Sequence, residues 1–302
     1  MNRLLLVLRA YALCIRSRAL AIFSFCWATF IGALIVSRGI PQLFPLFTIL
    51  TIGFAMTTAA YILNDVVDLE IDRINIDVIL SSLSPFKSHL DCPIAQGQVS
   101  KKEALSLVIL MTALALTLSL SVNTQTFLLC AAFLVLAFLY SSPKIYLKKR
   151  FIAKQTVAGT GGAISNLIGG AAVGGMSTSL VYAAALFFIF TFVGSPIFDF
   201  VDIRGDREKG ARTLSVVLGP VFTIRFAVVT LLSFLAVTIL VYPLVGLNIV
   251  APFLITSSIL LFSWASFPLL RKWNDPKYLT NAYRKIAVSF FVAELAVFLG
   301  VF

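Results

Sequence analysis

Residues 43–72 read LFPLFTILTIGFAMTTAAYILNDVVDLEID, an apolar run that ends in a cluster of acids. The apolar part is long enough to cross a bilayer as a helix, which takes about twenty residues. Asn64, Asp68 and Asp72 are spaced four residues apart, so on a helix they point the same way. Like charges one turn apart repel each other and are costly to desolvate at a membrane edge. We therefore expect a divalent cation to bind at the end of this helix.

The composition indicates an all-α, polytopic membrane protein. Of the 302 residues, 60% are hydrophobic and only 12% are charged, an apolar content far above that of soluble domains. The formal net charge of +11 would suit a nucleic-acid partner, but basic residues also gather on the cytoplasmic side of membranes. Because the basic residues here follow a membrane pattern, the lipid bilayer is the expected partner and nucleic acid is not.

Nine apolar stretches have the length of a membrane-spanning helix. They cover residues 18–37, 43–64, 103–121, 125–143, 155–175, 179–199, 218–242, 248–270 and 282–302. All but Arg38 of the 24 Lys and Arg residues lie at the amino terminus, in the even-numbered loops or at the helix ends beside those loops. Since short cytoplasmic loops retain basic residues, we predict a multi-pass protein of the cell membrane with its amino terminus inside and its carboxyl terminus outside. Residues 1–302 are expected to form one domain.

A second acidic cluster lies at the end of the sixth apolar stretch, on the same predicted cytoplasmic side. Asp199, Asp202 and Asp206 again share one helix face. The loops after the two clusters, about 65–102 and 199–218, are long, and we expect them to cap a site between the clusters. Mg²⁺ prefers a few carboxylates with water and phosphate oxygens, so two or three Mg²⁺ ions bridging a diphosphate are predicted here. The predicted metal ligands are Asn64, Asp65, Asp68, Asp72, Asp199, Asp202 and Asp206.

Basic residues beside the acids are suited to hold phosphate oxygens that the metal leaves free. The predicted diphosphate-binding residues are Arg73, Lys144, Lys148, Arg204, Lys209 and Arg212, with Tyr140 facing the same site. Arg16 and Asn166 are candidates for binding an acceptor. Other roles stay open for both, since Arg16 also fits the topology signal and Asn166 also fits an interhelical hydrogen bond. Glu294, inside the ninth stretch, is expected to be protonated or paired.

The two acidic stretches resemble the two aspartate motifs of the UbiA superfamily of intramembrane prenyltransferases. Residues 64–72 are similar to its NDxxDxxxD signature, and residues 199–214 are similar to its second motif and the Thr-Leu tail that follows it. Residues 140–150, which hold Tyr-Ser and Lys-Lys-Arg, resemble a third feature of the family. The resemblance spans the whole chain and implies nine helices around a central cavity that opens to lipid. It also implies Mg²⁺-dependent transfer of a prenyl chain from a prenyl diphosphate to an acceptor.

Within this resemblance, the expected reaction is ionisation of the prenyl diphosphate to an allylic cation, which the acceptor attacks. The expected catalytic residues are Asp68, Asp72, Asp202, Asp206 and Tyr140. Metals and basic residues stabilise the departing diphosphate, while an apolar cavity excludes water. We expect an aromatic acceptor such as 4-hydroxybenzoate or a quinone precursor, as in 4-hydroxybenzoate polyprenyltransferases. The alternative is prenyl ether formation on geranylgeranylglyceryl phosphate, as in archaeal lipid synthesis.

One segment departs from the family pattern. Cys92 stands where the family usually has Arg, after an insert near residues 76–90. Lys87 or His89 from the insert is a candidate substitute for that Arg. The four cysteines show no paired or metal-ligand spacing, so we expect them to be small packing residues.

Two other classes of protein are less consistent with the sequence. A secondary transporter would also carry buried acids, but it does not need two acidic clusters with interleaved basic residues at one membrane face. A non-catalytic lipid-binding or scaffold protein would need neither cluster. We therefore predict an enzyme, a prenyltransferase, with its active site on the cytoplasmic side.

Overall fold

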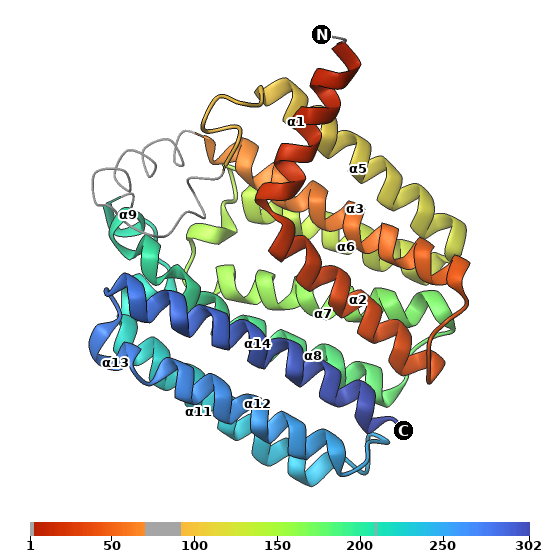
Figure 1. Ribbon diagram of the computed structural model, residues 1–302, viewed down its shortest axis with the longest axis vertical. Helices are drawn as coiled ribbons and strands as arrows, with labels where there is room; N and C mark the ends of the chain where they lie inside the picture. Colours follow the sequence, from red (N-terminus) through yellow and green to blue (C-terminus); the bar gives the residue numbers. More distant parts are fainter. Residues whose placement is uncertain (1–2, 70–91, 209) are drawn as a thin grey trace.

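The computed structural model describes residues 3–69, 92–208 and 210–302, apart from the side chain of Asp202. Every regular element within those ranges is helical, which confirms the all-α prediction. The long helices run side by side and form one bundle (Figure 1). The predictions that fall outside the described residues concern Asp72, Arg73, Lys87, His89, Lys209 and the insert near 76–90.

The long helices of the described chain begin and end close to the predicted apolar stretches. They are α1 Arg3–Ser17, α2 Ala19–Ser37, α3 Leu43–Val67, α5 Lys101–Val122, α6 Thr124–Ser141, α7 Ala153–Val173, α8 Thr178–Phe198, α11 Pro220–Val241, α12 Val250–Ser266 and α14 Pro276–Gly300. The shorter helices are η1 Leu147–Lys149, η2 Asp199–Asp202, α9 Ile203–Glu208, α10 Leu214–Leu218 and α13 Leu269–Lys272. Each predicted stretch coincides with one long helix, and α1 is additional to the prediction.

Seven of the described helices are long and apolar enough to cross a membrane, namely α2, α3, α5, α6, α8, α11 and α12 with its extension. The other two predicted spans coincide with α7 and α14. Glycines and polar residues make α7 less apolar, and α14 carries Arg284, Lys285 and Glu294. The structure thus supports a multi-pass helical membrane protein, while the count of nine spans and the orientation of the termini stay predictions.

Side-chain caps explain where three of the long helices begin. At α5, the Ser100 hydroxyl accepts from the backbone N–H of Glu103 at 3.2 Å, and the Glu103 carboxylate accepts from the backbone N–H of Ser100 at 2.8 Å. Asn123 caps α6 and Ser177 caps α8 by accepting from the backbone three residues further on. Such caps satisfy N–H groups that a helix otherwise leaves unpaired at its start.

Glycines bring α7 into close contact with α2. A Cβ at Gly32 of α2 would lie 2.0 Å from the carbonyl oxygen of Asn166, and a Cβ at Gly169 of α7 would lie 1.9 Å from that of Thr29. Any side chain at either position would therefore force the two backbones apart. Helices in membranes associate closely where small residues permit it. Gly169 is explained by this contact, whereas Gly159, Gly162 and Gly170 of α7 lie against side chains of α8.

Both acidic segments follow helices that end on the same side of the bundle. The first follows α3, and the second follows α8 and continues as η2, α9 and α10. The predicted loop at 199–218 is therefore largely helical. The backbone N–H of Arg212 donates to the carbonyl of Lys149 at 2.9 Å and ties this segment to η1. This contact brings the second acidic segment next to the basic turn that follows α6.

Candidate active site

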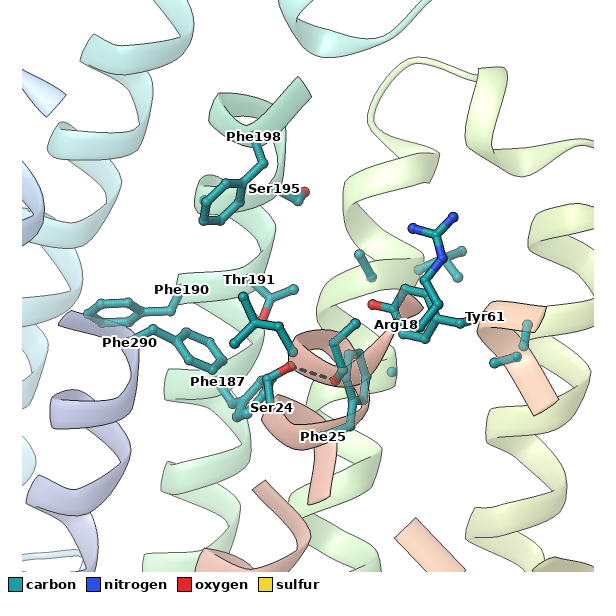
Figure 2. A pocket seen from close by; sticks show the side chains of 18 of the residues that line it. Arg18, Ser24, Phe25, Tyr61, Phe187, Phe190, Thr191, Ser195, Phe198 and Phe290 are labelled. Atoms are coloured by element: carbon teal, nitrogen blue, oxygen red, sulfur yellow. Dashed lines mark hydrogen bonds between the residues drawn. The ribbon is translucent and has the colours of Figure 1, made fainter. Parts of the chain in front are cut away.

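A pocket of about 530 Å³ lies between α2, α3, α6, α7, α8, α12 and α14, beside the acidic end of the bundle. Arg18, Tyr61, Asn64 and Tyr140 line it at that end. The deeper walls are mostly aromatic and aliphatic, and Figure 2 shows several of the phenylalanines around the cavity. The pocket combines a polar mouth with an apolar chamber, an arrangement that suits a ligand with a polar head and an apolar tail.

Next to the polar end of the pocket, which Asn64 lines, a group of side chains converges on the Lys148 ammonium. The last turn of α3 places Asn64 and Asp68 on one face, as their spacing predicts. The Lys148 ammonium donates to Oδ1 of Asn64 at 3.2 Å and forms an ion pair with the Asp68 carboxylate. The Tyr146 hydroxyl donates to Oδ1 of Asp68 at 3.0 Å. The amide oxygen of Asn64 and the carboxylate of Asp68 thus both contact the Lys148 ammonium. Oxygen ligands of these two kinds also fit Mg²⁺.

A strained turn carries Lys148 to this position. Tyr146, with φ of 50°, and Ile152, with φ of 62°, lie on either side of η1 in the left-handed region. Non-glycine residues rarely adopt this conformation, and it is most unfavourable for a β-branched side chain. Strained backbone persists where the surrounding structure holds it in place, and it clusters at functional sites. The strained turn between α6 and α7 is therefore a candidate part of the functional site.

Burial, together with the positive charges of Lys154 and Lys149, lowers the pKa of Lys148 to about 7. The carboxylates of Asp65 and Asp206 act in the opposite direction but are outweighed. The cause is the cost of keeping an ammonium group in a poorly solvated, positively charged surrounding. The charged form of Lys148 is therefore less favoured than that of an exposed lysine.

Asp65 follows Asn64 in α3, so its side chain points in a different direction and contacts a different partner. Its carboxylate accepts from Nε of Arg18 at 3.0 Å and makes a second, closer contact with the same guanidinium. The Asp65 side chain is only 1% exposed, so its charge is balanced inside the protein. Asp65 is predicted above as a metal ligand, but both of its oxygens are engaged by Arg18. We therefore leave Asp65 out of the proposed metal-binding set.

The second acidic segment is anchored to the start of α7. Nζ of Lys154 lies 2.7 Å from Oδ1 of Asp199. Asp206 lies in α9, close enough for its charge to act on Lys148. Within the described residues, no group of three or more His, Cys, Asp and Glu side chains could by itself hold a metal ion. The metal-binding role of the second segment, including that of Asp202, stays a prediction.

The remaining predicted residues fall into two groups. Tyr140 lines the pocket, and Asn166 is fully buried against α2 and is not among the described residues that line it. The exposed residues are Arg16, Lys144, Arg204 and Arg212. Of these, Arg204 pairs along α9 with Glu208 at 3.2 Å, and its side chain is 85% exposed. The structure therefore does not bring the Arg204 side chain to the site.

Three residues at the site had no predicted role. By sequence, Arg18 and Lys154 are only basic residues at helix ends, and Tyr146 lies inside the segment 140–150 that resembles a third feature of the family. Lys154 follows that segment by one turn and lies on the same predicted side, which is a signal for its contact with Asp199. The sequence holds no signal that separates Arg18 from Arg16.

Cys92 is a packing residue. It is 1% exposed and lies in a core cluster with Cys14, Ile62 and Val66. A position surrounded by apolar side chains provides no contact for a phosphate group. The packing role predicted for the cysteines is confirmed here and at Cys130, which is buried in a second cluster.

The fold and the pocket define a class of protein: a helical membrane protein with acidic and basic side chains gathered at one end of an apolar chamber. Residues 25–291 match the UbiA prenyltransferase family, and the chain belongs to that family. Relatives are named as prenyl-transferring synthases, and the protein is accordingly an enzyme, a prenyltransferase.

Named relatives and solved structures resemble the chain over nearly its whole length. Digeranylgeranylglyceryl phosphate synthase from Thermococcus sibiricus is 26% identical over 272 residues, which cover 89% of this chain and 90% of that protein. The protein of the same name from Natronomonas pharaonis is 29% identical over 286 residues, covering 90% of each. The structure of a UbiA homolog from Archaeoglobus fulgidus bound to GPP and Mg²⁺ aligns with a TM-score of 0.72 over 96% of this chain and 99% of that chain, at 18% identity. The all-helical fold of the UbiA family is thereby confirmed, while the nine spans stay a prediction.

Proposed function

We propose that the protein transfers a prenyl chain from a prenyl diphosphate to the hydroxyl group of geranylgeranylglyceryl phosphate. Relatives that cover about nine-tenths of the chain are named digeranylgeranylglyceryl phosphate synthase, which supports this lipid acceptor over the aromatic acceptor expected from the sequence. The observation that carries the proposal is the convergence of Asn64 and Asp68 on the Lys148 ammonium at the mouth of the apolar pocket. This arrangement offers a place for a diphosphate head above a chamber for a prenyl chain.

Mg²⁺ fits the oxygen donors at the mouth of the pocket. The proposed ligands are Asn64, Asp68, Asp72, Asp199, Asp202 and Asp206, which together would hold two or three ions. The structure of the Archaeoglobus fulgidus homolog contains Mg²⁺ with GPP, which supports the same ion here. When bound, Mg²⁺ neutralises the charge that develops on the leaving diphosphate.

Lys148 is proposed to change partners when the donor binds. Its ammonium pairs with the Asp68 carboxylate in the structure. A diphosphate at the mouth supplies several anionic oxygens, and Lys148 then donates to them through charge-assisted hydrogen bonds. The carboxylate of Asp68 is thereby freed for a cation.

The apolar chamber is proposed to protect the reaction from water. Ionisation breaks the bond between C1 of the prenyl chain and a diphosphate oxygen, and the electron pair leaves with the diphosphate. Aromatic faces stabilise the allylic cation, and Tyr140 at the mouth is proposed to be one of them. The acceptor oxygen then bonds to C1, and its proton passes to an aspartate or to a diphosphate oxygen.

The acceptor and the membrane side follow from the basic residues. Arg18 lines the pocket, whereas Arg16 is exposed, so we propose Arg18 as the residue nearer to the acceptor phosphate. The basic loops beside the acidic segments support a site on the cytoplasmic side of the membrane.

The test is to incubate the purified protein with Mg²⁺, geranylgeranyl diphosphate and one acceptor at a time, and to identify the product by mass. We expect a product with geranylgeranylglyceryl phosphate and none with 4-hydroxybenzoate, and we expect the Asp68→Asn variant to form neither. A product with 4-hydroxybenzoate alone would contradict the lipid acceptor and support the aromatic acceptor instead. Absence of transfer to any acceptor would overturn the proposal.

A further inference from the structure

Two hydroxyl groups interrupt the apolar wall that α8 gives to the chamber. Thr191 and Ser195 lie four residues apart on α8, so they share one face of the helix, and both line the chamber. Their hydroxyl oxygens are buried, and among the described residues neither has a hydrogen-bond partner. Figure 2 shows the two residues in line along α8, between Phe198 and Phe187. A buried hydroxyl without a hydrogen bond costs free energy, so both groups favour a polar ligand that enters the chamber.

The other serines that line the chamber all have a partner. Ser24 donates to the carbonyl oxygen of Ala21 at 2.8 Å, and Ser17 donates to that of Cys14 at 2.7 Å. Ser141 donates to Oδ1 of Asn64 at 3.4 Å. A serine or threonine inside a helix commonly bonds to its own backbone, as Ser24 does. Because Thr191 and Ser195 do not, their hydrogen bonds are left for a ligand.

Both hydroxyls lie further into the bundle than the acidic end. Asp199 follows Ser195 by four residues and Thr191 by eight, which corresponds to about 6 Å and about 12 Å of helix. The diphosphate of the donor is proposed to bind at the acidic end. Beyond its diphosphate, a prenyl donor consists of carbon and hydrogen only, so its chain offers nothing to which a hydroxyl could bond. The prenyl chain therefore does not explain Thr191 and Ser195.

The proposed acceptor carries oxygens that match the two hydroxyls. In geranylgeranylglyceryl phosphate, the free hydroxyl and the ether oxygen lie four or five bonds from phosphorus, roughly 5–6 Å in an extended chain. With the phosphate near Arg18, these oxygens reach about one helical turn inward, the depth of Ser195. An ether oxygen only accepts, and a serine or threonine hydroxyl can donate to it. We propose that Thr191 and Ser195 bind the glyceryl oxygens of the acceptor and select a glyceryl ether lipid, an inference that rests on the proposed lipid acceptor.

The test measures KM for geranylgeranylglyceryl phosphate and for geranylgeranyl diphosphate in steady-state kinetics of the purified protein with Mg²⁺. Thr191→Val combined with Ser195→Ala removes both hydroxyls with little change in size. We expect this double variant to raise KM for the acceptor by about tenfold and to leave KM for the donor within about twofold of the parent value. A hydrogen bond between neutral groups accounts for roughly threefold to tenfold in affinity.

Two control variants separate the hydroxyl groups from packing. Thr191→Ser keeps the hydroxyl and removes a methyl group, and it is expected to keep the acceptor KM of the parent protein. Ser24→Ala removes a hydroxyl that also lines the chamber but already donates to Ala21. This variant is expected to leave the acceptor KM unchanged as well.

An acceptor analogue with a methylene group in place of the ether oxygen identifies the atom that is bound. We expect the parent protein to show a KM for the analogue about fivefold higher than for the acceptor, and the double variant to treat the two alike. An unchanged acceptor KM in the double variant, or a donor KM that rises by the same factor, would overturn the inference. A parent protein that does not distinguish the analogue would also overturn it. A parent protein that transfers no prenyl chain to geranylgeranylglyceryl phosphate would overturn the proposed function itself.

Discussion

Replacing Asp65 with asparagine is expected to destabilise the protein without removing its Mg²⁺-dependent binding of prenyl diphosphate. In the structure, both carboxylate oxygens of Asp65 contact the guanidinium of Arg18, and the Asp65 side chain is 1% exposed. Asparagine keeps the size of the side chain but removes its charge. Arg18 then loses its anion in a site that is largely closed to water, and this is the costly outcome for a buried pair.

The expected cost follows from the exposure of the two partners. Breaking a buried ion pair from one side costs about 3–5 kcal/mol. The Arg18 side chain is 19% exposed, so water compensates part of its charge. We therefore expect a cost at the lower end of this range, about 3 kcal/mol. That figure lowers the folding equilibrium constant by about 100-fold. Arg18→Met combined with Asp65→Asn removes both charges, and the loss is expected to be smaller than the sum of the two single losses.

A thiol-reactive dye can follow unfolding in a denaturing detergent, because Cys14, Cys92 and Cys130 are buried in the folded protein. The same preparations are then tested for Mg²⁺-dependent binding of geranylgeranyl diphosphate. The reasoning is refuted if Asp65→Asn unfolds like the parent protein and loses this binding, since Asp65 would then be a metal ligand after all.

Three other substitutions test separate parts of the structure. Lys148→Gln is expected to raise KM for the prenyl diphosphate by about tenfold or more, since a hydrogen bond to a charged group contributes ~1.5–3 kcal/mol; steady-state kinetics that leave KM unchanged would exclude Lys148 as a phosphate contact. Cys92→Arg is expected to lower the unfolding midpoint without improving KM, because residue 92 is 1% exposed in an apolar core; a stable variant with tighter donor binding would contradict this. Gly162→Ala is expected to cost about 1–3 kcal/mol of stability, since its Cβ would lie 2.1 Å from the Phe187 ring. Gly161→Ala is the matched control, because the nearest atom to its Cβ would lie at 3.4 Å. Equal melting curves for the two variants would count against the close packing.

The positions of the long helices could be predicted from the sequence, because crossing a bilayer requires long apolar runs that are visible by length alone. The first predicted stretch, 18–37, coincides with α2, and the second, 43–64, coincides with α3 except for its last turn. α1 could not be predicted in this way, because it is shorter than a span and carries Arg9 and Arg16. Its Ala10 and Cys14 pack in a core cluster that only the folded chain forms.

The site could be predicted where helical spacing alone decides it. Asn64 and Asp68 share a face because they are four residues apart, and the structure confirms this. The partner of Asp65 could not be predicted, since the choice of Arg18 depends on how α2 is rotated against α3. The phenylalanines that line the pocket could not be predicted either. The chain has 27 of them, and only the packed helices bring Phe25, Phe133 and Phe187 together.

The most direct test of the account is the affinity of the purified protein for geranylgeranyl diphosphate, measured with and without Mg²⁺ in the parent protein and in Asp68→Asn. The diphosphate and its cation are expected to bind at the Asp68 carboxylate, which pairs with Lys148 in the structure. We expect Mg²⁺ to tighten binding to the parent protein, and the substitution to weaken binding by at least about tenfold and to remove the Mg²⁺ dependence. Equal affinity and equal Mg²⁺ dependence in the two proteins would contradict the central claim.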